Sequence, residues 1–259
     1  MPLSTTLPPA LPEPSPGSWI TVSNGPVPLR CWWSPSPSLK PDHRAVIVLP
    51  EIFGLNAWVR GVTDRLSAAG VPALAMPLFA RTAPALDLGY DPESVVEGRR
   101  HKQATTTEGI LADVQAAITW LHKTLDHPQP SLQITVVGFC FGGHAALLAA
   151  TLAEVKISLD FYGAGVNQGR PGGGSPSLDL LPSVQGELHC LCGGLDPLIP
   201  PHDQKAIEAA LRDVDPTGER LRFSVLAEAD HGFMCDARNQ FHESSARAGW
   251  RVLLDAVQA

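Results

Sequence analysis

The most informative stretch of this chain is VVGFCFGGHAA, residues Val136–Ala146. It reads as a buried strand, a Gly-x-Cys-x-Gly-Gly turn and a helix of small residues, which is the pattern of a nucleophile elbow with cysteine in place of the usual serine. A strand that turns abruptly into a helix strains the backbone at the nucleophile and brings helix and strand close, so glycines must flank it. The turn also places Cys140 at a helix N-terminus, where the helix dipole favours a thiolate. We therefore predict that Cys140 is a nucleophile; the alternative is a packing cysteine beside a glycine turn.

On both sides of this stretch, short apolar runs alternate with helical segments. Strands are expected at Ala45–Leu49, Val71–Met76, Ile134–Val137, Val155–Phe161, Leu188–Cys192 and Leu221–Leu226. Helices are expected at Asn56–Ala69, Ala104–Thr124, Phe141–Leu152, Gln204–Leu211 and Phe241–Val257. Continuous apolar strands flanked by helices predict an α/β fold with a mostly parallel sheet covered on both faces.

The chain reads as one domain with a loose leader. Residues 18–259 form the expected α/β domain, and the Pro-rich residues 1–17 are expected to be flexible. The turn-rich segment Gly163–Gly186 is expected to be an exposed loop, because the alternation of strands and helices resumes beyond it.

Composition excludes several classes of function. The 259 residues carry a net charge of −7 and no run of Lys or Arg, which argues against nucleic acids and membranes as partners. No apolar run is long enough to span a bilayer, and the N-terminus does not resemble a secretory signal. Five cysteines form an odd, sparse set that fits a reducing compartment. We expect a cytoplasmic protein that is a monomer or a weak homo-oligomer.

A nucleophile elbow predicts an acid and then a histidine further along the chain. Asp196 follows the expected strand Leu188–Cys192, and His231 follows the expected strand Leu221–Leu226. His231 would act as the base toward Cys140, and Asp196 would fix its tautomer. Asp230 is the less favoured acid, because neighbours in an extended chain point apart.

The remaining histidines and cysteines can be interpreted either as site residues or as residues that only stabilise the fold. His144, four residues after Cys140, is the histidine most expected to line the site, whereas the others read as solvated or satisfied. Cys190 and Cys192 have the spacing of a metal pair, but no second pair with zinc-site spacing accompanies them, so we interpret them as core residues. Cys31 and Cys235 are likewise interpreted as packing or loop residues.

The segment PEIFGLN, Pro50–Asn56, follows the first buried strand. Backbone amides at this position commonly supply half of an oxyanion hole, and the amide after the nucleophile supplies the other half. We therefore expect the amides of Ile52 and Phe141 to be the donors. Glu51 lies among apolar residues at a strand end, where burial would raise its pKa and let it exchange a proton with the thiol.

Together these residues resemble the dienelactone hydrolase (carboxymethylenebutenolidase) family of the α/β-hydrolase superfamily. The resemblance implies an α/β-hydrolase core, no cofactor or metal, and a catalytic triad of Cys140, Asp196 and His231. It covers roughly residues 18–258. The matching stretches, in family order, are Pro50–Asn56, Phe79–Arg81, Gly138–Gly143, Gly193–Asp196 and His231–Phe233.

The resemblance also implies a reaction. Glu51 would pair with the resting thiol, be displaced by substrate and take the thiol proton, and the thiolate would open an enol-lactone through a thioester. Arg81 matches the first of two family arginines that bind the substrate carboxylate. Cys235 stands where the second is usual, and Arg238 follows shortly after it.

Phe53 and Trp58 are also expected to contact the substrate, a small lactone or ester that bears a carboxylate. Two alternatives stay open from the sequence. One is a broad carboxylesterase or thioesterase, and the other is a non-catalytic relative that senses a ligand or redox state through Cys140.

Overall fold

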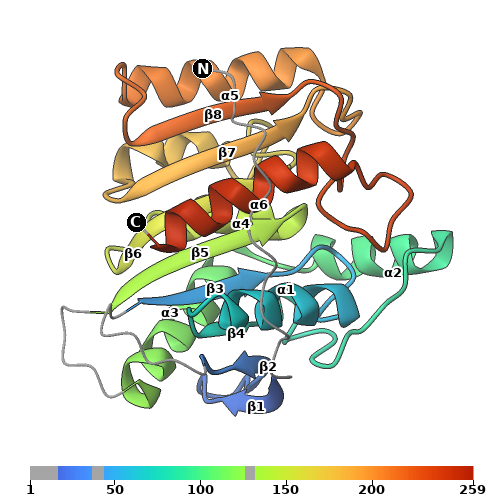
Figure 1. Ribbon diagram of the computed structural model, residues 1–259, viewed down its shortest axis with the longest axis vertical. Coiled ribbons are helices and arrows are strands. Elements are labelled where there is room, and N and C mark those ends of the chain that lie inside the picture. The colour runs from blue at the N-terminus through green and yellow to red at the C-terminus, as the bar shows by residue number, and fades with distance from the viewer. Residues whose placement is uncertain (1–16, 37–43, 126–131, 259) are drawn as a thin grey trace.

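The computed structural model describes residues 17–36, 44–125 and 132–258, so all but the last residue of the predicted leader lies outside the described part. The described chain forms an eight-stranded sheet in the order β1-β2-β4-β3-β5-β6-β7-β8 (Figure 1). Its strands are β1 Ser18–Val22, β2 Leu29–Ser34, β3 Arg44–Leu49, β4 Ala73–Ala75, β5 Gln133–Phe139, β6 Val155–Phe161, β7 Glu187–Gly193 and β8 Leu221–Leu226. β2 runs antiparallel to β1 and β4, and all other neighbours are parallel.

Helices cover both faces of this sheet, as the sequence predicted. They are α1 Ala57–Ala68, α2 Pro92–Gln103, α3 Thr107–Thr124, α4 Phe141–Ala149, α5 Pro201–Val214 and α6 Glu243–Gln258, with a 3-10 helix η1 at Ser177–Ser183. α1 and α6 lie in front of the sheet in Figure 1, and α3 and α4 lie behind it. Because successive side chains of a strand point to opposite faces, Val46 and Val48 of β3 join one core cluster and Ala45, Ile47 and Leu49 join the other.

Three local expectations were incomplete or wrong. The expected helix Ala104–Thr124 begins only at Thr107, because the Thr106 side chain caps it by accepting from the Gly109 amide at 3.1 Å. The separate helix α2 precedes it, and the hairpin of β1 and β2 adds two strands. The expected exposed loop Gly163–Gly186 contains η1, whose Ser177 and Leu181 are fully buried.

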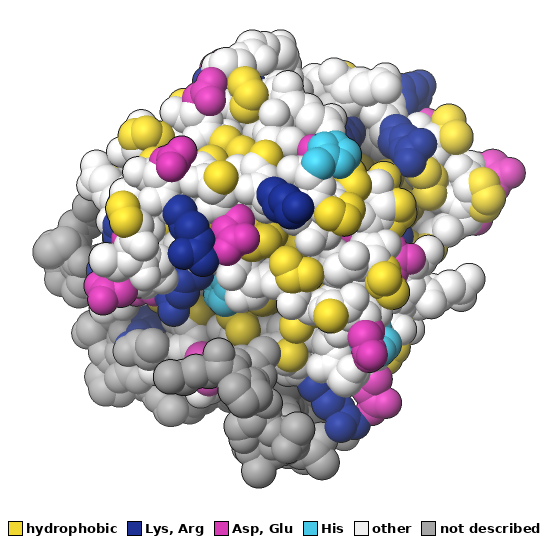
Figure 2. Space-filling model, turned by 90° about the horizontal axis from the view of Figure 1, so that it is seen from above, with side chains coloured by type: hydrophobic (Ala, Val, Ile, Leu, Met, Phe, Trp, Pro, Cys, Tyr) yellow, Lys and Arg dark blue, Asp and Glu magenta, His cyan; other side chains and the backbone are white. Residues whose placement is uncertain are grey.

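The surface at the β8 edge is mixed in character. Figure 2, seen from the α5 and β8 side, shows acidic and basic side chains interspersed with apolar ones. The ion pairs of these elements include Arg212–Glu208 within α5 at 2.9 Å and Arg222–Glu187 between β8 and β7. Within the described ranges, no helix has the length and apolar character needed to cross a membrane.

Candidate active site

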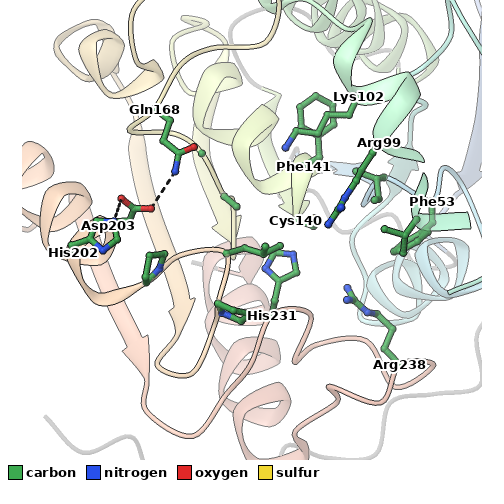
Figure 3. A pocket seen from close by; sticks show the side chains of 17 residues that line it. Phe53, Arg99, Lys102, Cys140, Phe141, Gln168, His202, Asp203, His231 and Arg238 are labelled. Carbon is green, nitrogen blue, oxygen red and sulfur yellow. Dashed lines mark hydrogen bonds and ion pairs between the residues drawn. The ribbon is translucent and has the colours of Figure 1, made fainter. Parts of the chain in front are cut away.

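Four predicted side chains meet at one edge of the sheet. Glu51, Cys140, Asp196 and His231 follow β3, β5, β7 and β8, which are parallel strands of one sheet. The carboxyl ends of such strands share one edge, where α/β proteins collect their functional groups. Figure 3 shows Cys140 and His231 at the centre of a cavity there.

The turn at Cys140 has the geometry of a nucleophile elbow. Cys140 has φ 55° and ψ −119°, a conformation that costs backbone energy in a non-glycine residue. A side chain at Gly138 would place its Cβ 1.8 Å from the Gly142 carbonyl oxygen, and one at Gly142 would lie 2.3 Å from the Leu49 oxygen. A Cβ at Gly143 would approach Asp160 Oδ1 to 2.3 Å. The glycines are therefore required by close packing, as the sequence predicted.

Asp196, rather than Asp230, is the acid that contacts the His231 ring. Asp196 Oδ2 lies 2.8 Å from His231 Nδ1, and its Oδ1 accepts a hydrogen bond from the Leu198 amide at 2.7 Å. Asp230 Oδ1 accepts instead from the His231 backbone amide, at 2.6 Å. Asp196 is thus fixed by the backbone and fixes the imidazole in turn.

The other ring nitrogen of His231 is available for chemistry. Nε2 is buried and has no hydrogen-bond partner among the described N and O atoms. Burial lowers the pKa of His231, but the neighbouring Cys140 and the hydrogen bond to Asp196 outweigh burial and raise the pKa to about 10. An imidazole that holds its proton beside the sulfur could stabilise a thiolate, which is the form in which a cysteine is a nucleophile.

The Glu51 carboxylate is held by Arg238 in this structure, which differs from the pairing with the thiol that the resemblance implied. Oε1 accepts a hydrogen bond from Arg238 Nη1 at 2.7 Å, and Oε2 is buried with no partner among the described residues. Burial raises the pKa of Glu51, and the charge of Arg238 opposes that rise. A guanidinium compensates a buried carboxylate better than a neutral thiol can, which accounts for the difference.

A cavity of about 540 Å³ opens in front of the nucleophile. Ile52 and Phe141, the expected oxyanion residues, both line it. Phe141 is the first residue of α4, so its amide belongs to the helix N–H groups that have no partner within the helix. The role of both amides remains a prediction that fits this placement.

Two of the four expected substrate-binding residues line this cavity, and two do not. Phe53 and Arg238 lie in its wall. Arg81 is outside the lining, because Asp113 of α3 holds its guanidinium by two hydrogen bonds, at 2.6 and 2.9 Å. Trp58 is also outside, because it lies on the buried face of α1 and packs edge-on against Phe139, 4.9 Å between ring centroids.

Sequence reasoning missed the wall that α2 supplies. Val95, Arg99 and Lys102 line the cavity from this helix, and Figure 3 shows the Arg99 and Lys102 side chains pointing inward. Their i, i+4, i+7 spacing places them on one helix face. The available signal was the start of α2, where Asp91 caps the helix and Pro92 is its first residue.

The opposite wall contains a buried carboxylate that the sequence did not single out. Asp203 accepts hydrogen bonds from Asn167 Nδ2 at 2.6 Å and Gln168 Nε2 at 3.3 Å, and His202 Nε2 lies 3.3 Å from it. These contacts satisfy Asp203 and tie α5 to the loop after β6 (Figure 3).

His144, Cys190 and Cys192 lie outside the lining of the Cys140 cavity. His144 is held between the Ala164 carbonyl oxygen at 3.2 Å and Ser177 Oγ at 2.7 Å, and it does not line the cavity of Cys140. Cys190 and Cys192 are buried, as expected of core residues. Over the described ranges, no group of three or more His, Cys, Asp or Glu side chains is placed to hold a metal ion.

Comparisons with known proteins identify a family for most of the chain. The model of the "Dienelactone hydrolase family" matches residues 35–259. A Synechocystis protein named "Putative carboxymethylenebutenolidase" is 37% identical over 217 residues, which cover 84% of this chain and 86% of the relative. A Bradyrhizobium protein named "Probable 2-oxo-3-(5-oxofuran-2-ylidene)propanoate lactonase" is 27% identical over 212 residues, 81% of each chain.

Solved structures show the same fold. The "Putative Dienelactone Hydrolase from Klebsiella pneumoniae" superposes with a TM-score of 0.79 at 24% identity, covering 92% of this chain and 96% of that one. With the observed strand order, this likeness establishes the α/β-hydrolase fold.

Proposed function

The chain belongs to the dienelactone hydrolase family of hydrolases, which act on small-molecule esters or lactones, and from this premise we propose that it opens enol-lactones or cleaves related activated esters through a cysteine acyl-enzyme. The observation that carries the proposal is the 2.8 Å contact between Asp196 and His231 beside Cys140 at the elbow. The Bradyrhizobium relative is named for a lactone with a carboxylate, which supports the same substrate class.

In the proposed first step, the thiolate of Cys140 adds to the carbonyl carbon of the lactone. The carbonyl oxygen becomes an oxyanion, for which the amides of Ile52 and Phe141 are the proposed donors. The carbon–oxygen bond of the ring then breaks and leaves an enolate, which takes a proton from His231 Nε2 and so returns the imidazole to its neutral form. Cys140 and the former carbonyl carbon are now joined as a thioester.

In the second step, His231 Nε2 takes a proton from water, and the hydroxide adds to the thioester carbonyl. The carbon–sulfur bond breaks and restores the thiolate beside the imidazolium, and the carboxylic acid that forms loses its proton to solvent and leaves as a carboxylate. Asp196 holds the imidazole in the required orientation throughout. This cycle requires Cys140 in its reduced form, so we propose that the protein works in a reducing compartment such as the cytoplasm.

Glu51 takes a different place in this proposal from the one the resemblance implied. With its carboxylate held by Arg238, the thiol proton passes to His231, whose Nε2 has no other partner among the described side chains. Arg238 then serves both to hold Glu51 and to face the substrate from the cavity wall.

Arg99 is the proposed binding group for the substrate carboxylate in the main cavity. Among the described residues it forms no ion pair or hydrogen bond, and its side chain points toward Cys140 (Figure 3). Arg81, by contrast, is already occupied by Asp113. A guanidinium without a partner is suited to bidentate carboxylate recognition.

The test is hydrolysis by a Cys140→Ala variant, measured with a dienelactone and with 4-nitrophenyl acetate. We expect kcat/KM to fall by about 10³-fold or more for both substrates, and the wild-type protein to show an acyl adduct on Cys140 by mass spectrometry during turnover. Cys31→Ala, which removes a buried thiol elsewhere in the sheet, is the control. Undiminished turnover by Cys140→Ala would overturn the proposal.

A broad carboxylesterase is the second candidate, and the exclusion of Arg81 from the cavity favours it. The two candidates differ in their dependence on substrate charge. A dienelactone hydrolase with Arg99 as anchor should prefer carboxylate-bearing substrates and lose that preference in Arg99→Met, whereas a broad esterase should show neither effect.

A further inference from the structure

A second chamber of about 280 Å³ adjoins the cavity of Cys140. The two spaces share five lining residues, so the chamber lies directly beside the cavity. The shared residues are Lys102, Phe141, Ala164, Gly165 and Gln168. Beyond this passage, the chamber is lined by Gln103, His144 and the loop Gly169–Gly172.

The loop that closes the chamber is anchored to the start of α3. The Pro171 carbonyl oxygen accepts hydrogen bonds from the Thr107 amide at 2.8 Å and from Thr107 Oγ1 at 2.9 Å. Gly172 has φ +87° and lies so close to Thr106 that a Cβ would meet the Thr106 Cβ at 2.9 Å. The wall is therefore held by backbone contacts that this Gly-rich sequence permits.

A basic group of this loop is held in a fixed orientation. Arg170 donates from Nε to the Ser175 carbonyl oxygen at 3.0 Å and from Nη2 to Ser175 Oγ at 2.7 Å. Nη1 makes no hydrogen bond or ion pair with a described residue, so one nitrogen of a pre-oriented guanidinium is left without a partner there. A fixed guanidinium loses less side-chain entropy when it binds an anion.

The chamber is positively charged. Its lining carries Lys102 and Arg170 and, within the described part of the chain, no Asp or Glu. His144 adds no charge near neutral pH, because burial lowers its pKa to about 4 and the nearby charge of Lys102 lowers it as well. Lys102 Nζ lies 5.4 Å from the centre of the Phe141 ring at the passage and forms no ion pair with a described acidic side chain.

We propose that this chamber binds a second, anionic arm of an extended ester or lactone, with Lys102 and Arg170 as the groups that hold its terminal carboxylate. This inference rests on the proposed function, because it assigns a substrate shape to the same nucleophile. It adds a requirement that the main cavity does not impose: the substrate is long enough for one end to pass Lys102 while its carbonyl carbon lies at Cys140.

The test uses pairs of 4-nitrophenyl esters of linear dicarboxylic acids, from adipate to sebacate, whose far end is either a free carboxylate or its methyl ester. Each pair has nearly the same length and differs in charge. Shorter acids are avoided because their free carboxylate attacks the ester within the same molecule. We expect the kcat/KM of the acid to exceed that of its methyl ester by about tenfold at one or two chain lengths, as a single charge-assisted contact would give.

Two variants assign the preference to the chamber. Lys102→Met removes the charge but keeps the apolar stem, and Gln103→Glu adds a negative charge to a residue that lines only the chamber. We expect each to lower the acid-to-methyl-ester ratio by about five- to tenfold, because each variant makes the charge that faces the terminal carboxylate less positive. Lys123→Met, at an exposed lysine of α3 outside both linings, is the matched control and should leave the ratio unchanged.

The outcomes separate this inference from the proposed function. If methyl esters are cleaved but the acids are not preferred, or if the preference survives both Lys102→Met and Gln103→Glu, the chamber does not bind an anionic arm and the hydrolase proposal stands. If neither kind of ester releases 4-nitrophenolate, both proposals fail together.

Discussion

Glu51 Oε1 accepts a hydrogen bond from Arg238 Nη1 at 2.7 Å, and this contact joins the loop after β3 to the loop after β8. The Glu51 side chain is 1% exposed and that of Arg238 is 14% exposed. The guanidinium lies 5.8 Å from the ring centres of both Phe53 and Tyr90. Gly232 makes room for it, since a Cβ there would lie 2.4 Å from Nη1. Each half of the pair is therefore buried in a place where few other groups could compensate its charge.

Removal of Arg238 should leave Glu51 as a buried carboxylate without the guanidinium that pairs with it. We expect Arg238→Met to lower the free energy of unfolding by about 3 kcal/mol at pH 8, as urea unfolding would measure. Burial then raises the pKa of Glu51 without the opposing charge. If the pKa of Glu51 is higher in the folded than in the unfolded variant, protonation stabilises the fold at low pH, and this stabilisation is lost as pH rises. Arg238→Met should therefore destabilise the protein less at pH 5 than at pH 8.

The double variant Glu51→Gln/Arg238→Met tests the cause. It should recover much of the lost stability, because no buried charge is left unpaired. Arg212→Met, which breaks an exposed pair with Glu208, should change stability by less than about 0.5 kcal/mol. A double variant no more stable than Arg238→Met would contradict the account.

The part of the site that could be predicted from the sequence is the part fixed by local geometry. The elbow around Cys140 depends on glycines adjacent in sequence, and the strand ends place Asp196 and His231 by a general rule of parallel sheets. The choice of Asp196 over Asp230 needed only the alternation of side chains in an extended chain, and Asp196 is the one of the two that contacts the His231 ring.

The residues that sequence reasoning misplaced depend on distant partners. Arg81 forms an ion pair with Asp113, 32 residues further along the chain, and no local sequence pattern predicts that pair. Glu51 likewise accepts a hydrogen bond from Arg238, which lies 187 residues away in the sequence. The direction of Trp58 follows from which face of α1 meets the sheet.

The helix α2 escaped detection for a different reason. Hydrophobic periodicity reveals a helix whose buried face is apolar, whereas the buried face of α2 consists of Ser94, Gly98 and His101. Gly98 lies so close to the loop after β3 that a Cβ would be 2.4 Å from the Ile52 carbonyl oxygen. A helix that packs through small and polar residues has no apolar stripe in its sequence. Because α2 was not predicted, its cavity-lining residues Arg99 and Lys102 were not predicted either.

Arg81 and Arg99 should respond to mutation in opposite ways. Arg81→Met removes the ion-pair partner of the buried Asp113 carboxylate and leaves it, among the described residues, only the hydrogen bond from Asn24, so we expect a stability loss of about 1–3 kcal/mol. Its KM for a carboxylate-bearing ester should stay within about twofold of wild type, since Arg81 lies outside the cavity lining. Arg99→Met should raise that KM by about fivefold or more and leave stability nearly unchanged, because Arg99 has no described partner to lose.

Steady-state kinetics and urea unfolding of the two variants check this contrast. A large KM effect from Arg81→Met, with none from Arg99→Met, would return the carboxylate anchor to Arg81 and require the Arg81–Asp113 pair to open during binding.

Asp196 and Asp230 offer a matched pair for the orientation of His231. Asp196→Asn removes the carboxylate that fixes the imidazole, and we expect kcat to fall by roughly 10³- to 10⁴-fold. Asp230→Asn keeps an oxygen for the His231 backbone amide and should retain kcat within about threefold. Initial rates at saturating substrate make the comparison, and similar losses in both variants would show that the loop, rather than the Asp196 contact, determines activity.

The pKa of His231 should depend on the charge of Cys140. In the wild-type protein, burial lowers it, but Cys140 and Asp196 raise it to about 10. Cys140→Ala removes the thiolate and keeps the burial, so we expect the imidazole of His231 to titrate at least about one pH unit lower. NMR titration of the histidine ring signals, assigned with a His231→Gln variant, measures the difference.

His144 is the internal control for this titration. Its pKa of about 4 follows from burial, and its ring is held by Ala164 and Ser177, so Cys140→Ala should leave its titration unchanged. The shifted pKa of His231 also predicts how stability depends on pH. Because its folded-state pKa is about 10 and its ordinary pKa is 6.5, protonated His231 contributes its full stabilisation below about pH 6.5, and this contribution is lost as pH rises through about 10. Wild-type protein should therefore lose more unfolding free energy than Cys140→Ala over that interval. If His231 titrates at the same pH in both proteins, the thiolate–imidazolium pair does not form in the free protein, and Cys140 acquires its charge only after substrate binds.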